Sequence, residues 1–149
     1  MSFMRRVVWV VVLAWTVGGA AAEEPKTHPF SVHDMLAMDR LSEWQASPDG
    51  KTIVFVRRTT DLEANKGRTD LWLVNADGTA LRRLTTHPDA DHSPRWTPDG
   101  KTIYILSTRS GSPQIWRIAA DGGEAQQVTK EPLDVGSFVL SRDGSRIAF

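Results

Sequence analysis

The sequence predicts an all-β fold: a partial β-propeller with two complete four-stranded blades and the start of a third, preceded by a signal peptide and a short helix. Three observations predict it. A tight-turn motif recurs along the chain, its period lies in the forties, and each repeat holds four short β patterns. This combination is typical of propeller blades. The 149 residues are 40% hydrophobic and 24% charged, which is the composition of a globular protein.

Charge and cysteine content exclude several classes of function. Basic and acidic residues both number 18, so the formal net charge is zero and no basic excess points to nucleic acid. The chain has no cysteine, which excludes disulfides, thiolate zinc sites and cysteine nucleophiles. We expect no cofactor and no nucleic-acid partner.

Residues 1–22 predict a secretory signal peptide. Arg5 and Arg6 precede an apolar run over 7–17, and small residues in an A-x-A arrangement end the segment at Ala22. A membrane span needs about 17–25 apolar residues, and acidic residues end this run too early. We therefore expect cleavage, no stable membrane anchor, and an exported protein, periplasmic or secreted. The absence of cysteine suits a bacterial envelope.

The segment 23–40 is predicted to contain a short helix over 32–39. Ser31 can cap it, Asp34 stands at the third helical position, and Phe30 can contact Met35 across the first turn. The buried stripe of this helix is expected to consist of Val32, Met35 and Leu36.

Residues 41–149 form the incomplete propeller. The predicted blades cover about 41–88, 92–132 and, truncated, 137–149. The turn at 47–50 recurs at 97–100 and again at 141–144.

The offsets between repeats are regular. Trp72 and Trp116 are 44 residues apart, as are the turn residues Asp99 and Asp143. Asp49 and Asp99 are 50 residues apart, so the first unit carries six extra residues.

Each unit reads as four strands joined by tight turns. Proline presets φ for a turn, aspartate bonds its own backbone and glycine takes positive φ. In the first unit this predicts strands near 44–47, 52–56, 71–74 and 80–85. The turn aspartates are interpreted as turn formers, because a catalytic carboxylate is needed once and a turn is needed in every blade.

Trp72 and Trp116 are interpreted as core packing between blades rather than as ligand-stacking residues. The face that carries them is expected to be the buried one. The extra residues of the first unit predict a solvated loop rather than an anion site, because acidic residues interrupt its positive charges. Those positive charges are Arg57, Arg58, Lys66 and Arg68.

One polar cluster lies at the junction between the first two units. His87, Asp89, Asp91 and His92 could together bind a metal, but a solvated inter-blade loop is the favoured interpretation. No G-x-S-x-G elbow, phosphate loop or H-E-x-x-H motif occurs. We therefore assign no catalytic, cofactor-binding or metal residue.

The last residue, Phe149, falls inside the second strand of a third unit. Propellers have about 4–8 blades, and an open ring leaves apolar faces and strand edges uncovered. We therefore expect the chain to be the N-terminal piece of a longer protein. Residues 23–149 produced alone are expected to aggregate or stay partly molten.

Six stretches of the chain carry a family resemblance, at residues 28–36, 41–42, 47–56, 69–74, 77–78 and 84–85. Through them the mature chain resembles the opening of the prolyl oligopeptidase family of serine peptidases. The similarity is to the acylaminoacyl-peptidase and dipeptidyl-peptidase branch. TolB-type propellers share the turn motif, but the short helix directly before the first blade favours the peptidases.

The resemblance implies a propeller that covers a C-terminal α/β-hydrolase domain and admits only short peptides. The nucleophilic serine, aspartate and histidine belong to that domain, and none falls within residues 1–149. The implied partner is a peptide substrate. Two alternatives stay open: a non-catalytic TolB-like binding propeller, and a propeller-type polysaccharide lyase. The oligomeric state stays open too.

Overall fold

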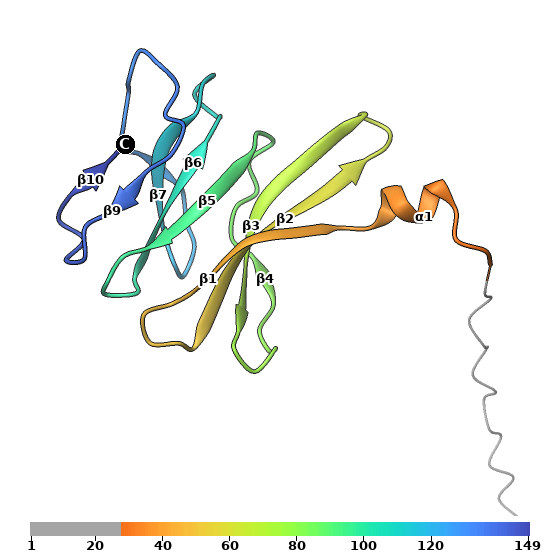
Figure 1. Cartoon of the computed structure of the whole chain (residues 1–149), viewed down its shortest axis with the longest axis horizontal. Helices are drawn as coiled ribbons and strands as arrows, with labels where there is room; N and C mark the ends of the chain where they lie inside the picture. The colour runs from red at the N-terminus through yellow and green to blue at the C-terminus, as the bar shows by residue number, and fades with distance from the viewer. Residues whose placement is uncertain (1–27) are drawn as a thin grey trace, which may run out of the picture.

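The computed structural model describes residues 28–149, and the predicted signal peptide lies outside the described residues. One helix, α1 (Val32–Ala37), precedes three antiparallel sheets (Figure 1). The first sheet contains β1 (Arg40–Ala46), β2 (Thr52–Asp61), β3 (Lys66–Asn75) and β4 (Arg82–Arg83). The second contains β5 (Asp91–Trp96), β6 (Thr102–Ser107), β7 (Gln114–Ala119) and β8 (Gln126–Gln127). The third contains β9 (Val139–Leu140) and β10 (Ile147–Ala148).

Both four-stranded sheets are built in sequence order, β1-β2-β3-β4 and β5-β6-β7-β8. Each blade is therefore formed by one continuous stretch of chain. Strand β5 of the second sheet packs against the first sheet, and the sheets lie side by side in Figure 1. This is the arrangement of a partial β-propeller, as the repeat predicts.

The repeated turn has the predicted chemistry. In the first blade, the Asp49 carboxylate accepts hydrogen bonds from the Ser47 hydroxyl at 2.5 Å and from the Lys51 amide at 3.1 Å. Gly50 takes φ +70°, in the left-handed region that favours glycine. Asp99 and Asp143 accept the same pair of bonds in their own turns. Their interpretation as turn formers is confirmed.

The turns also touch one another across the blades. A Cβ atom placed on Gly100 would lie 3.6 Å from Pro48 Cδ, and one placed on Gly144 would lie 2.8 Å from Pro98 Cδ. The proline of each turn thus meets the glycine of the next turn. The motif therefore fixes the spacing between blades as well as the reversal within each blade.

The main core lies between the first two blades. Trp116 packs against it, so the interpretation of this tryptophan as core packing is confirmed. The other face of the second blade is buried too, where Leu106 and Ile115 meet Phe138 of the third unit. The core between the first two blades consists of Val54, Leu71, Leu73, Leu84, Ile103, Ile105 and Ile118.

The first blade buries the face opposite its tryptophan. Val54 and Leu71 lie on that face and are fully buried, whereas Trp72 is only half-buried. The expectation that the tryptophan side is the buried one thus holds for the second blade and is wrong for the first. The reason is position, because a neighbouring blade covers the tryptophan face only in the second blade.

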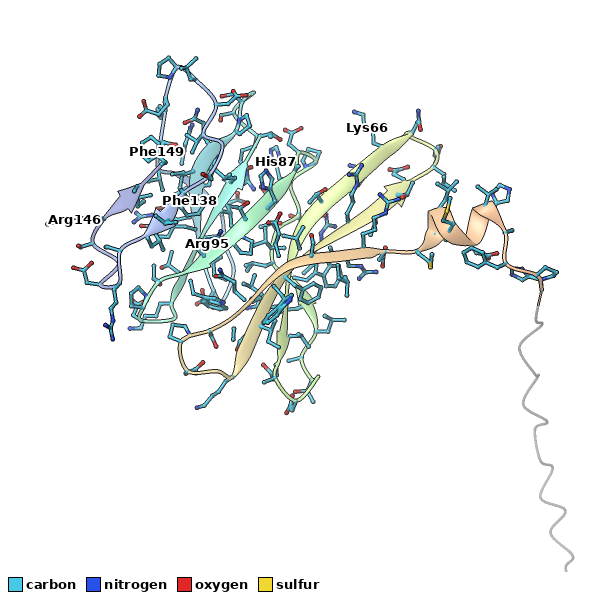
Figure 2. All side chains as sticks on the ribbon, in the orientation of Figure 1. Lys66, His87, Arg95, Phe138, Arg146 and Phe149 are labelled. Carbon is cyan, nitrogen blue, oxygen red and sulfur yellow. The ribbon has the colours of Figure 1, made fainter. Side chains whose placement is uncertain are left out.

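The six extra residues of the first unit do not form a solvated loop. They lengthen β2 and β3 into a hairpin whose pairing continues to Asp61 and Lys66. Figure 2 shows Lys66 at the projecting tip. The loop prediction was wrong because paired strands accommodate charged side chains on their exposed faces, so charge alone does not indicate a loop.

Helix α1 has the predicted capping box. The Asp34 amide donates to the Ser31 hydroxyl, and the Asp34 side chain accepts from the Ser31 amide at 2.7 Å. The helix ends at Ala37, two residues before the predicted end. The predicted buried stripe is wrong: Val32 is 58% exposed, Met35 is 47% exposed and Leu36 is half-buried. The helix stands beside the first sheet and meets it at β2, which leaves much of the helix surface exposed (Figure 1). No helix in the described part of the chain is both long and apolar enough to cross a membrane.

Candidate functional site

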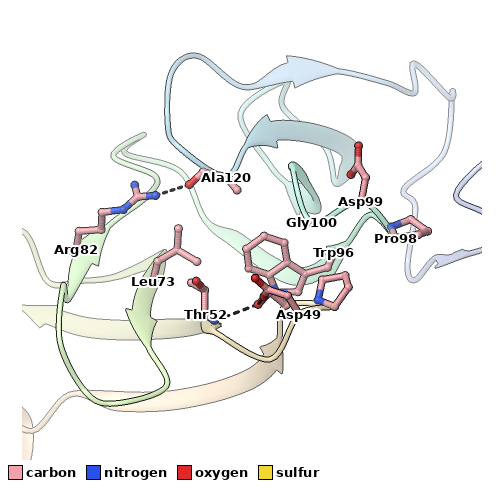
Figure 3. Close-up of a pocket in the computed structure, with 11 residues that line it drawn as sticks. Asp49, Thr52, Leu73, Arg82, Trp96, Pro98, Asp99, Gly100 and Ala120 are labelled. Carbon is pink, nitrogen blue, oxygen red and sulfur yellow. Dashed lines mark hydrogen bonds between the residues drawn. The ribbon is translucent and has the colours of Figure 1, made fainter.

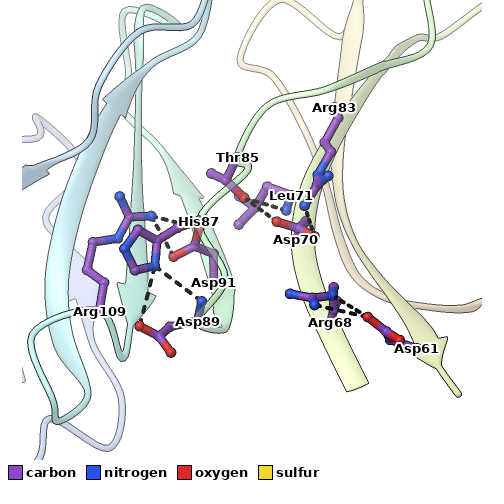
Figure 4. Close-up of polar contacts among 10 residues, drawn as sticks. All are labelled: Asp61, Arg68, Asp70, Leu71, Arg83, Thr85, His87, Asp89, Asp91 and Arg109. Carbon is purple, nitrogen blue, oxygen red and sulfur yellow. Dashed lines mark hydrogen bonds and ion pairs between the residues drawn. The ribbon is translucent and has the colours of Figure 1, made fainter. Parts of the chain in front are cut away.

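The polar groups gather at the seam between the first two blades (Figure 4). They lie away from the repeated turns, since Asp91 pairs with Ser107 at the end of β6 that is remote from the turn. Strands β3 and β4 supply Asp70 and Arg83, and β5 begins with Asp91. Arg109 follows the end of β6, and His87 lies in the connection between β4 and β5. The seam thus joins charged groups of both blades.

A buried ion pair holds the second blade together at this seam. Asp91 is 0% exposed, and Arg109 Nη2 donates to both of its carboxylate oxygens, at 2.8 and 2.7 Å. Arg109 Nε also donates to Ser107 Oγ at 2.8 Å, and the guanidinium lies 5.0 Å from the centre of the Trp116 ring. A buried carboxylate with these partners is satisfied, so Asp91 serves the fold.

Asp70 forms a second charged contact on the first blade. Arg83 Nη2 donates to Asp70 Oδ2 at 2.6 Å, and the Thr85 hydroxyl lies 3.5 Å from Asp70 Oδ1. Burial raises the pKa of Asp70, and the negative charge of nearby Asp91 acts in the same direction. Asp70 therefore takes up a proton more readily than an exposed aspartate.

The same position in the second blade is neutral. Gln114 stands 44 residues after Asp70 and is 2% exposed. Its Oε1 accepts from the Thr129 hydroxyl at 2.8 Å and from the Glu131 amide at 3.0 Å. Thr129 corresponds to Thr85, so the network repeats while the charge at its centre does not.

The four side chains of the candidate metal cluster do not converge: His87 Nδ1 lies 3.5 Å from Asp89 Oδ2, whereas Asp91 and His92 have other partners. Asp91 faces Arg109, and the Asp89 amide donates to His87 Nδ1 at 3.2 Å. His92 Nδ1 lies 3.0 Å from Ser93 Oγ. Within residues 28–149, no three acidic or histidine side chains are placed together as metal ligands would be. The structure therefore assigns Asp91 to its arginine and not to a metal.

The basic residues of the long hairpin are partly paired. Arg57 Nε donates to Asp39 Oδ2 at 2.7 Å, and its guanidinium lies 4.5 Å from the centre of the Trp72 ring. Arg68 donates to Asp61 from Nε at 3.1 Å and from Nη2 at 2.9 Å. The arginines thus stabilise the hairpin and its junction with the segment before β1.

The sequence alone did not single out Asp70, Gln114 or Arg109. The signal for the first two was present, because they occupy one repeat position with different chemistry. Arg109 is different: its partner lies 18 residues away and no local pattern links the two.

Comparison with known proteins agrees with the fold. Residues 42–149 match the family of the TolB beta propeller domain. The chain is 29% identical over 140 residues to dipeptidyl-peptidase 5 of Porphyromonas endodontalis, covering 94% of this chain and 20% of that protein. It is 48% identical over 96 residues to the Tol-Pal system protein TolB of Anaeromyxobacter dehalogenans, covering 64% of this chain and 22% of that protein.

A solved structure shows the same architecture. The β-propeller domain of the trilobed protease from Pyrococcus furiosus superimposes with a TM-score of 0.58 at 20% identity, covering 73% of this chain and 33% of that one. The chain spans about a fifth of the length of the two curated relatives.

Proposed function

Because this chain belongs to the TolB β-propeller domain family, we propose that it forms the propeller of an exported serine peptidase that cleaves short peptides. The observation that carries the proposal is the similarity to dipeptidyl-peptidase 5, which extends over 140 residues. That length exceeds the 108 residues of the propeller match at 42–149, so the similarity includes the segment before the first blade.

In this proposal the propeller selects substrates and does not perform the chemistry. The sequence contains no G-x-S-x-G elbow, so the nucleophile is placed in an α/β-hydrolase domain outside residues 1–149. There a serine activated by histidine would attack the peptide carbonyl, with an oxyanion hole stabilising the intermediate. The blades would confine the substrate and exclude folded proteins by size.

The buried seam supports a rigid wall. The core between the first two blades resists separation of the sheets, and the Asp91–Arg109 pair holds the second blade itself together. A size filter needs such rigidity, because blades that separate easily would admit large substrates. Export is supported by the signal-like composition of residues 1–22.

The test uses the full-length protein with aminoacyl and dipeptidyl chromogenic substrates. We expect hydrolysis that a serine-directed phosphonate abolishes, and a rate that falls steeply as the peptide lengthens. Hydrolysis insensitive to the phosphonate would remove the serine-peptidase reading. Equal rates on short peptides and on an unfolded protein would rule out selection by size but would leave the serine-peptidase activity standing.

A second candidate is a non-catalytic TolB-like binding propeller. The specific observation in its favour is the 48% identity to TolB over 96 residues. This candidate predicts no hydrolysis of any of these substrates by the full-length protein.

A further inference from the structure

A pocket lies between the repeated turns of the first two blades (Figure 3). It occupies the other end of the same seam from Asp70 and Asp91. Its volume is about 420 Å³, which is within the range of ligand-binding sites. The apolar lining consists mainly of Pro48, Leu73 and Trp96, and the polar lining includes Asp49 and Asp99. An apolar surface beside two carboxylates fits a ligand with an apolar stem and a positive charge.

Both carboxylates are held in place by their turns. Asp49 and Asp99 each use Oδ1 to accept a hydroxyl and a backbone amide, and these hydrogen bonds lower the pKa of both groups. The two groups are therefore ionised at neutral pH. In the described part of the chain, neither Oδ2 atom accepts a hydrogen bond, so each remains free to accept one from a ligand.

The neighbouring cations leave room for a further positive group. Arg82 lines the pocket, but its guanidinium donates to the Ala120 carbonyl (Figure 3). Lys51 and Lys101 follow the two aspartates in the turns, and their charges contribute to the lowered pKa values. Neither lysine lines the pocket.

The chain itself shows which cation suits such a surface. It twice combines a tryptophan ring, an arginine and an aspartate: Arg57 lies over Trp72 and bonds an aspartate, and Arg109 lies over Trp116 and bonds another. Trp96 shares its pocket with two aspartates, yet none of the arginines among residues 28–149 lies over its ring. The third tryptophan thus has the carboxylates of this arrangement and lacks the arginine.

The repeated motif alone does not produce this pocket, because the junction between the second and third blades has a different lining. At the next seam, the positions of Trp96 and Pro98 are taken by Leu140 and Arg142. The position of Leu73 is taken by Arg117. The second seam therefore replaces apolar lining with arginines of its own, whereas the first seam leaves the site open.

We propose that this pocket binds an arginine side chain presented by a partner polypeptide. The guanidinium stacks on the Trp96 ring and donates to Asp49 and Asp99, while the aliphatic stem contacts Pro48 and Leu73. Arginine is favoured over lysine because its planar group both stacks on an aromatic ring and pairs with carboxylates. The proposal does not depend on whether the full-length protein is a peptidase.

The experiment follows the Trp96 indole N–H signal by NMR in the full chain labelled with ¹⁵N-tryptophan. The probe is acetyl-Gly-Arg-Gly-amide, and the comparison peptide carries citrulline, which keeps the shape of arginine without its charge. We expect a saturable shift of the Trp96 signal with the arginine peptide and none with the citrulline peptide. Equal shifts with both peptides, or no saturable shift with either, would overturn the proposal.

Variants locate the binding. Asp49→Asn and Asp99→Asn should each weaken binding at least about fivefold, since each removes a charge-assisted hydrogen bond. Asp143→Asn is the matched control, because it changes the same turn position beside Leu140 and Arg142 and should leave binding unchanged. An equal loss in the control would place the binding elsewhere.

Pro98→Arg provides an independent test of the binding if the aspartate variants disturb their turns. The third turn carries arginine at this position, so the turn accommodates it. The new guanidinium should occupy the pocket and abolish the peptide-induced shift. Undiminished binding to a folded Pro98→Arg protein would also overturn the proposal.

Discussion

Replacing Arg109 by methionine tests how much the buried ion pair stabilises the second blade. Methionine keeps the apolar stem and removes the charge and the hydrogen-bond donors. Asp91, which is 0% exposed, would then lose the Arg109 Nη2 that donates to both of its oxygens and would remain a buried carboxylate. Leaving one member of a buried pair without its partner costs about 3–5 kcal/mol. Loss of the contact with the Trp116 ring adds up to about 2 kcal/mol in a desolvated setting.

Arg57→Met is the matched control. Arg57 also pairs with an aspartate and lies over a tryptophan, at 4.5 Å compared with 5.0 Å for Arg109. Its side chain is 29% exposed, whereas that of Arg109 is 10% exposed. Exposed pairs contribute about 0–1 kcal/mol, so the two variants differ mainly in burial.

The assay is urea unfolding of the full chain followed by far-ultraviolet circular dichroism, with the free energy of unfolding taken by linear extrapolation. Arg109→Met should lose several times more stability than Arg57→Met. The double variant Asp91→Leu/Arg109→Met should recover much of the loss, because no unpaired charge remains. A loss equal to that of the control, or a double variant no better than Arg109→Met, would refute the reasoning.

Three further predictions concern other contacts. First, Asp70 has a folded-state pKa above its ordinary value of 3.8, so it favours folding at low pH and this contribution is lost as the pH rises through the raised value. The free energy of unfolding of the natural chain, minus that of Asp70→Asn, should therefore fall as the pH rises above 3.8. An increase of this difference with rising pH would contradict the reasoning. Second, the new Cβ of Gly144→Ala would lie 2.8 Å from Pro98 Cδ, whereas the Cβ of Gly50→Ala, at nearly the same φ, would have no atom within 4 Å. Both variants should lose about 1–2 kcal/mol from the left-handed backbone, and hydrogen exchange should show extra opening of the third turn in Gly144→Ala alone. Third, Gln114→Ala leaves the Thr129 hydroxyl and the Glu131 amide without their acceptor, so thermal unfolding should show a loss of about 1–3 kcal/mol per buried group left unpaired. A midpoint unchanged from the natural chain would show that water replaces the glutamine.

The blades were predictable because their signals are local and repeated. A Pro-Asp-Gly turn fixes where the chain reverses, and the same reversal returns at Gly50 and Gly100 with φ +70° and +68°. The helix cap was predictable for the same reason, since Ser31 and Asp34 interact within one turn.

Burial was less predictable because it depends on neighbours far along the chain. The apolar residues of α1 suggest a buried stripe, yet Val32 is 58% exposed because the helix stands beside the first sheet. The lengthened hairpin was missed for a related reason. Threonines at 59 and 60 favour strands, but the charges around them suggested a loop.

The candidate metal cluster shows that polar residues close together in the sequence do not by themselves predict a shared site. Asp91 stands next to His92 in the sequence, which suggests a shared role, but their side chains contact different partners in the structure. The decisive partner of Asp91 is Arg109, which comes close only after β6 has paired with β5. A polar cluster in a repeat protein is therefore better judged by the pairing of its strands than by its spacing.

Differences between repeats point to the features that are specific to this chain. Positions that recur with the same chemistry, such as the turn aspartates, serve the fold, since every blade needs them. Positions that differ are free of that requirement: Asp70 becomes Gln114, and Trp96 becomes Leu140. The first difference places a titratable group in a buried network, and the second helps to leave a pocket open beside two ionised carboxylates. Both features lie at the seam between the first two blades, one at each end, so this seam is the part of the propeller where substitutions should separate function from folding.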